Sequence, residues 1–195
     1  MIDRIKQILT APKTAWTVVE SEYTPHVKLF TQYVLPLALI PAIAAFVGYG
    51  FVGYSVFGVR VHSIEWGIRQ AVSQYIAMTG GVYLTAFVIN FLAETFGARK
   101  DFDRAFSLVT WSYMPMFVGG VFYVIPSLSW LASLAGVYGL YLLYIGLQPM
   151  MKQPAEKTTG YFIACLVVAA LIATVLSITL ASILLGSYGA AAFRL

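Results

Sequence analysis

Long apolar segments dominate the chain, and polar residues are confined to short stretches between them. An α-helix needs about 20 apolar residues to cross a hydrocarbon core of about 30 Å. Backbone groups in lipid must be hydrogen-bonded within the segment, so we interpret each segment as a helix rather than a strand. The pattern therefore predicts five transmembrane helices in an all-α polytopic bundle, over residues 30–54, 72–93, 106–125, 128–147 and 161–185.

The third and fourth segments are separated only by Pro126 and Ser127. Read as one, they would be far longer than the roughly 20 residues that a bilayer needs. Proline removes a backbone donor, and Ser127 and Ser129 can cap a new helix. We therefore predict a tight helical hairpin whose two helices are antiparallel neighbours.

Basic residues are distributed unequally between the two sides that five spans define. An excess of Lys and Arg marks the cytoplasmic side of a membrane protein. The sequence therefore predicts a cytoplasmic N-terminus and a C-terminus on the opposite side. The N-terminal side holds Arg4, Lys6, Lys13, Lys28, Arg99, Lys100, Arg104, Lys152 and Lys157, and the other side holds Arg60, Arg69 and Arg194.

Residues 1–28 form a polar segment before the five-helix domain of residues 29–195. Residues 2–9 place apolar side chains on one helical face, and Pro12 ends this pattern or opens a second short helix. A short amphipathic helix with basic flanks and a tryptophan fits the headgroup plane, with Ile5, Ile8 and Trp16 as a membrane-surface anchor. The alternative is that the same face packs on the cytoplasmic ends of the bundle. On the other side of the membrane, residues 55–71 are expected to include a short amphipathic helix.

Composition supports a membrane protein without a separate soluble domain. Hydrophobic residues make up 60% of the 195 residues and charged residues only 10%, against about 25% charged in soluble domains. The net charge of +4 is spread over short loops, so no basic face of a nucleic-acid-binding protein is expected. The single cysteine, Cys165, lies within an apolar run and is expected to be a buried thiol.

Groups for enzyme chemistry are not found together in the sequence. His26 and His62 fall on opposite sides of the membrane, so they cannot share a metal ion. No serine has a convincing histidine base on its side, and the glycine pairs lie inside apolar spans rather than in a phosphate-binding loop. The sequence therefore predicts a non-enzymatic protein without metal or cofactor, whose partners are membrane lipids and possibly itself or other membrane proteins.

Polar residues inside or near the spans are candidates for a functional site, because such residues are costly in lipid. Glu94 and Asn90 lie at the inner end of the second span, and Tyr138, Tyr141 and Tyr144 lie on a broad face of the fourth. One interpretation is a polar pathway of a small channel or transporter. The other is hydrogen bonding between helices, which we favour for the tyrosines. Prolines in the first and third spans favour static kinks over moving parts. These prolines are Pro36, Pro41 and Pro115.

Small residues recur every fourth position in the fifth span. They form a smooth stripe that allows another helix to approach closely. The partner helix can belong to the same chain or to another subunit. The stripe comprises Ala169, Ala173, Ser177 and Ala181.

Several segments together resemble the Yip (Ypt-interacting-protein) family over most of residues 8–175. They are the proline-flanked run 33–41, the run from Phe106 to Pro115, the hairpin proline Pro126, residues 139–147, the tail to Gly160, and Pro12 followed by Trp16. The resemblance implies a five-helix membrane domain with a cytoplasmic N-terminus. Eukaryotic members bind Rab-type GTPases and act in vesicle traffic. This chain lacks their long N-terminal region and their Asp-Leu-Tyr-Gly-Pro type motif, and it looks more like the short prokaryotic branch.

We therefore expect an inner-membrane protein of this branch that acts by association with lipids or other membrane proteins, in a membrane-organising or trafficking-like role. The C-terminus would then be periplasmic. The alternative hypothesis is a small ion, proton or solute channel or transporter that uses Glu94 and Asn90.

Overall fold

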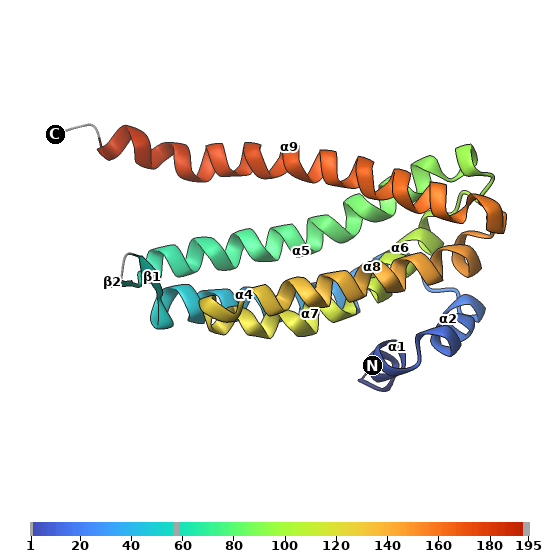
Figure 1. The fold of residues 1–195 in the computed structure, drawn as a ribbon, viewed down its shortest axis with the longest axis horizontal. Helices are drawn as coiled ribbons and strands as arrows, with labels where there is room; N and C mark the ends of the chain where they lie inside the picture. Colours follow the sequence, from blue (N-terminus) through green and yellow to red (C-terminus); the bar gives the residue numbers. More distant parts are fainter. Residues whose placement is uncertain (1, 57–58, 193–195) are drawn as a thin grey trace.

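The computed structural model describes the backbone of residues 2–56 and 59–192, and side chains over residues 4–53 and 62–175. In this part of the chain, five helical spans are long and apolar enough to cross a membrane (Figure 1). This confirms the predicted number of spans and the all-α helical bundle. The spans are His26–Val52, Ile64–Leu92, Phe102–Val124, Pro126–Met151 and Ala155–Val175.

Most spans are built from more than one helical element. The first contains α3 (His26–Leu29), η1 (Phe30–Val34), α4 (Leu35–Val47) and η2 (Gly48–Val52), and the second is α5 (Ile64–Leu92). After η3 (Glu94–Phe96), the third contains α6 (Phe102–Ser112), α7 (Met114–Gly119) and η4 (Gly120–Val124). The fourth contains η5 (Pro126–Leu128) and α8 (Trp130–Met151), and the fifth η6 (Ala155–Lys157) and α9 (Thr158–Ala192).

The third span lies in the centre of the bundle, where residues 105–112 are all buried. Its neighbours approach closely at glycines. A Cβ atom added at Gly119 would lie 2.5 Å from Cβ of Ala135, and one added at Gly120 would lie 2.5 Å from Cβ of Pro41. Spans three and four join through an extended Ile125 and the short turn η5, which confirms the predicted hairpin.

The segment that follows the first span differs from the prediction. Strands β1 (Tyr54–Val56) and β2 (Val59–Val61) pair antiparallel, with Ser55 opposite Arg60. The expected amphipathic helix in residues 55–71 is therefore wrong. Alternating β-branched residues favour a strand pair here, and the long helix α5 starts already at Ile64, where the Ser63 hydroxyl accepts a hydrogen bond from the Trp66 amide.

The two N-terminal helices, α1 (Ile2–Thr10) and α2 (Pro12–Ser21), pack against the side of the bundle near one end (Figure 1). The side chains of Ile8 and Trp16 are 0% and 2% exposed. A Cβ atom at Gly146 of α8 would lie 2.5 Å from the Trp16 indole, so this glycine makes room for the ring. The prediction of a membrane-surface anchor is thus wrong for Ile8 and Trp16, because these two side chains pack against the bundle and are not exposed to lipid. The alternative interpretation holds, and Ile5 also packs, half-buried, against the core.

The fifth span contacts the bundle mainly at its start. The Tyr161 hydroxyl donates to the Ile89 carbonyl, and Cys165 is buried, as predicted. Farther along, Leu171 and Val175 are each 63% exposed, and α9 diverges from α5 towards the C-terminus (Figure 1). The described part of the fifth span therefore leaves most of its surface uncovered by the rest of the bundle.

Gly146→Ala tests the contact that holds α2 on the bundle. The added methyl group would collide with the Trp16 ring and with Leu108, whose Cδ1 atom would be 2.7 Å away. Overpacking of this kind costs about 1–3 kcal/mol, so the melting temperature in detergent should fall by several degrees. The matched control is Gly136→Ala on the same helix, where an added Cβ meets nothing within 4 Å. Equal melting temperatures for the two variants would refute the contact.

Candidate functional site

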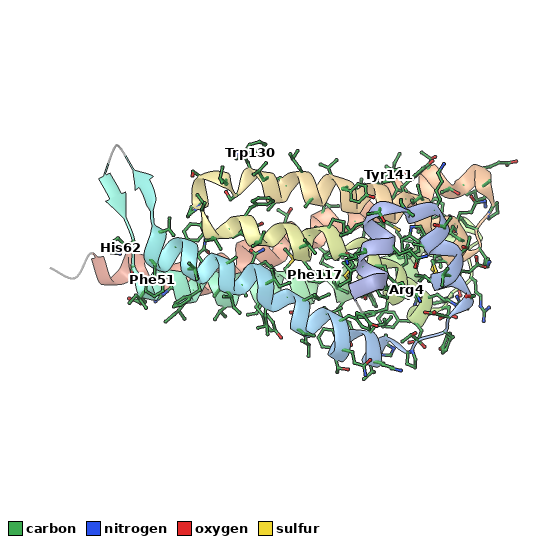
Figure 2. The ribbon with its side chains drawn as sticks, turned by 90° about the horizontal axis from the view of Figure 1, so that it is seen from below. Arg4, Phe51, His62, Phe117, Trp130 and Tyr141 are labelled. Carbon is green, nitrogen blue, oxygen red and sulfur yellow. The ribbon has the colours of Figure 1, made fainter. Side chains whose placement is uncertain are left out.

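Charged side chains gather at one end of the bundle. The first span begins at this end, which also holds the loop between spans two and three and the loop between spans four and five. We call this the N-terminal end. The Arg99 amide donates to the Met151 carbonyl across these two loops, at 2.8 Å. Figure 2 shows α1 and α2 lying across the bundle close to this end, with Arg4 beside them.

Asp103, in the first turn of α6, ties the connection between α2 and the first span to the bundle. Its Oδ1 atom lies 2.7 Å from the His26 amide nitrogen and 2.6 Å from His26 Nδ1. Its Oδ2 atom accepts a hydrogen bond from the Tyr23 hydroxyl. That hydrogen bond raises the pKa of Tyr23, which is already well above neutral pH. Arg104 adds a hydrogen bond from its guanidinium to the Glu20 carbonyl.

A cavity of about 290 Å³ opens between the N-terminal helices and the first and third spans. We call it the Arg4 cavity. Apolar side chains of Val19, Leu29 and Trp111 form the buried part of its wall, and each is at most 5% exposed. Its other lining residues are Arg4, Glu22, Thr24, Lys28, Gln32, Tyr33 and Ser107.

The charges of the Arg4 cavity do not balance. Arg4 Nη2 donates to Glu22 Oε1 at 2.7 Å, whereas Arg4 Nη1 is buried without a hydrogen-bond partner in the described part of the chain. Lys28, exposed at the start of the first span, forms no ion pair that the described residues show. Two cations against one carboxylate, with a guanidinium nitrogen still unsatisfied, favour a bound anion over a cation or a neutral group.

The intramembrane polar residues predicted from the sequence do not form one site. Glu94 lies in η3 beyond the end of α5; its side chain is 70% exposed, and its Oε1 lies 3.4 Å from Nζ of Lys100. Asn90 lies one turn earlier, and its Oδ1 atom is buried without a partner among the described residues. The tyrosines belong to α8, which is not among the main neighbours of α5. This arrangement gives no support to a polar pathway through the bundle.

Two of the three candidate tyrosines of α8 contact other helices instead. The Tyr138 hydroxyl donates to the Leu9 carbonyl at the end of α1, at 2.9 Å. The Tyr144 hydroxyl lies 3.2 Å from Oγ1 of Thr159 in α9. Tyr141 stacks on Tyr138 and is 45% exposed. The contacts of Tyr138 and Tyr144 match the favoured interpretation, in which these hydroxyls join helices.

The small-residue stripe of the fifth span is covered only in part where it is described. Ala169 is half-buried and Ala173 is exposed. The side chains of Ser177 and Ala181 lie outside the described residues. The stripe as a helix-packing site remains a prediction.

Sequence reasoning missed the Arg4 cavity because its residues were counted only as basic flanks of the first span. The available signal was the segment of residues 20–32, in which acidic, basic and amide side chains lie close to the start of an apolar helix. The contacts among these side chains depend on how α1 packs against the bundle, which the sequence pattern does not show. In the described residues, no group of three or more His, Cys, Asp or Glu could hold a metal ion.

Comparisons with known proteins cover nearly the whole chain. The family model of the Yip1 domain matches residues 6–188. The inner membrane protein YohC of Escherichia coli strain K12 is 28% identical over 171 residues, which cover 85% of this chain and 87% of YohC. YohC of Escherichia coli strain CFT073 matches to the same extent. No solved structure matches the chain. The matched region includes α2 and all five spans.

Asp103→Asn tests the tie between α2 and the first span. The amide keeps one acceptor oxygen but loses the charge that faces His26, and hydrogen bonds to charged groups contribute about 1.5–3 kcal/mol. Amide hydrogen exchange of residues 22–26 should therefore accelerate by at least about tenfold. The control is Glu156→Gln, an exposed carboxylate in η6. Unchanged exchange in the Asp103 variant would contradict the tie.

Proposed function

Because this chain belongs to the Yip1 domain family and its relatives are inner-membrane proteins, we propose that it is a non-enzymatic inner-membrane protein that acts by associating with membrane lipids. Its N-terminus would lie in the cytoplasm and its C-terminus in the periplasm. The observation that supports this function is the Arg4 cavity, an anion-favouring recess at one end of the spans.

The position of the Arg4 cavity suits a lipid headgroup. Lys28 and Gln32 belong to the first two turns of the first span, where a transmembrane helix meets the headgroup region. A phosphate group held there would accept hydrogen bonds from the guanidinium of Arg4 and from the ammonium of Lys28. Juxtamembrane basic residues attract anionic lipids of the cytoplasmic leaflet by about 1 kcal/mol each, and the proposed orientation places the cavity in that leaflet.

Association with other membrane proteins is the second part of the proposal. The described part of α9 has an apolar outer face. Four of its side chains are more than half exposed: Ile163, Val167, Leu171 and Val175. Such a surface is compatible with lipid and with another helix. The Arg4 cavity makes lipid association the better supported of the two.

Lipid binding should depend on the two cations of the Arg4 cavity. We expect Arg4→Gln and Lys28→Gln each to reduce retention of phosphatidylglycerol by about tenfold in native mass spectrometry, because each removes a charge-assisted hydrogen bond. Lys6→Gln is the matched control, since Lys6 is exposed on the same helix as Arg4 and does not line the cavity. If all three variants retain phosphatidylglycerol like the unmodified chain, the proposed lipid site is wrong.

The proposed orientation is testable by thiol labelling in spheroplasts of a Cys165→Ser chain. A membrane-impermeant maleimide should label His62→Cys in intact spheroplasts, and Glu156→Cys only after lysis, because the two exposed positions lie at opposite ends of the spans. The reverse labelling pattern would invert the orientation.

A further inference from the structure

A second cavity, of about 360 Å³, lies on the other side of α2, against the end of α8 and the start of α9. Lys13, Trp16, Tyr144, Gln148, Pro149 and Thr158 are among its lining residues. We propose that this Trp16 cavity binds an oxyanion, a phosphate or carboxylate group, through the indole N–H of Trp16 and the ammonium group of Lys13. It is a site separate from the Arg4 cavity.

The indole of Trp16 supplies the first part of the case. The side chain is 2% exposed, and its Nε1 atom is buried without a hydrogen-bond partner among the described residues. Buried polar groups are rarely left unpaired, and an indole N–H can only donate. The missing partner must therefore be an acceptor. The ring packs closely on Gly146, so it has little freedom to turn towards another acceptor of the chain.

The charge around the cavity supplies the second part. Lys13 is exposed and forms no ion pair in the described part of the chain, and no acidic residue lines the cavity. The nearest carboxylate along α2, Glu20, is paired with Lys152. The site therefore differs from the Arg4 cavity, where Glu22 offsets one of the two cations. An acceptor group that is also negatively charged satisfies both the indole and the lysine.

The remaining lining residues complete an anion site. Gln148 and Thr158 offer an amide and a hydroxyl donor beside the lysine, whereas the Thr17 hydroxyl donates to the Thr14 carbonyl. Thr17 and Gln148 are exposed, so the cavity opens to the N-terminal end of the bundle. Ile145, Pro149 and Ala155 add apolar wall. The same oxyanion can therefore arrive as a lipid headgroup or as a soluble ion, and binding assays separate these two sources.

The experiment measures phosphatidylglycerol by native mass spectrometry and inorganic phosphate by titration calorimetry, on the full chain in neutral detergent. All lipid and phosphate measurements are made in a Lys28→Gln background, so that binding at the Arg4 cavity does not mask the result. Two changes probe the site: Lys13→Gln, and replacement of the Trp16 indole N–H by sulfur in benzothienylalanine, which keeps the shape of the ring. Lys6→Gln is the control for charge alone.

We expect each change at Lys13 or Trp16 to weaken binding by about tenfold, while the control leaves it unchanged. An effect on phosphatidylglycerol alone identifies a lipid headgroup as the ligand, and an effect on phosphate identifies a soluble oxyanion. Either result supports the site. Binding of both ligands that is independent of Lys13 and of the indole N–H would overturn it. The Arg4 and Lys28 variants report on the Arg4 cavity independently, so failure of one site is distinguishable from failure of the other.

Discussion

The indole of Trp16 lies on Gly146, a position of α8 where any side chain would collide with the ring. This contact fixes α2 against the fourth span, and the arrangement of the whole N-terminal end depends on it. With α2 in this place, Glu20 reaches Lys152 and the Arg104 guanidinium, and Tyr23 and His26 reach Asp103. The N-terminal helices thus form part of the membrane domain rather than a separate tail.

The membrane spans could be predicted from the sequence because burial in lipid imposes a length and a composition on each helix. The hairpin at Pro126 could be predicted for the same reason, since a longer apolar helix would have no place in a bilayer. The strand pair after Gly53 could not, because each strand has only three residues, too few to distinguish their alternation from part of a helical pattern. The helix α5 begins at Ile64, several residues before the apolar segment that predicts the second span at residues 72–93.

The candidate site was less accessible to sequence reasoning. An amphipathic pattern shows that Ile5 and Ile8 share a face, but not whether lipid or protein covers it. Glu94 stands next to an apolar span in the sequence, yet its side chain is exposed and lies beside Lys100. Arg4 and Lys28 are 24 positions apart in the chain, and only the return of α1 along the bundle brings them to one cavity.

The helix α2 is a common wall of the two cavities, with Val19 on one and Trp16 on the other. An occupant of one cavity that displaced α2 from its contact with Gly146 would also change the space available in the other cavity. Binding in the two cavities would therefore be thermodynamically linked. Such linkage is reciprocal, because a ligand that changes the affinity of the other cavity by some factor has its own affinity changed by the same factor. The short helix α2, which packs on Gly146, would couple the binding of the two ligands.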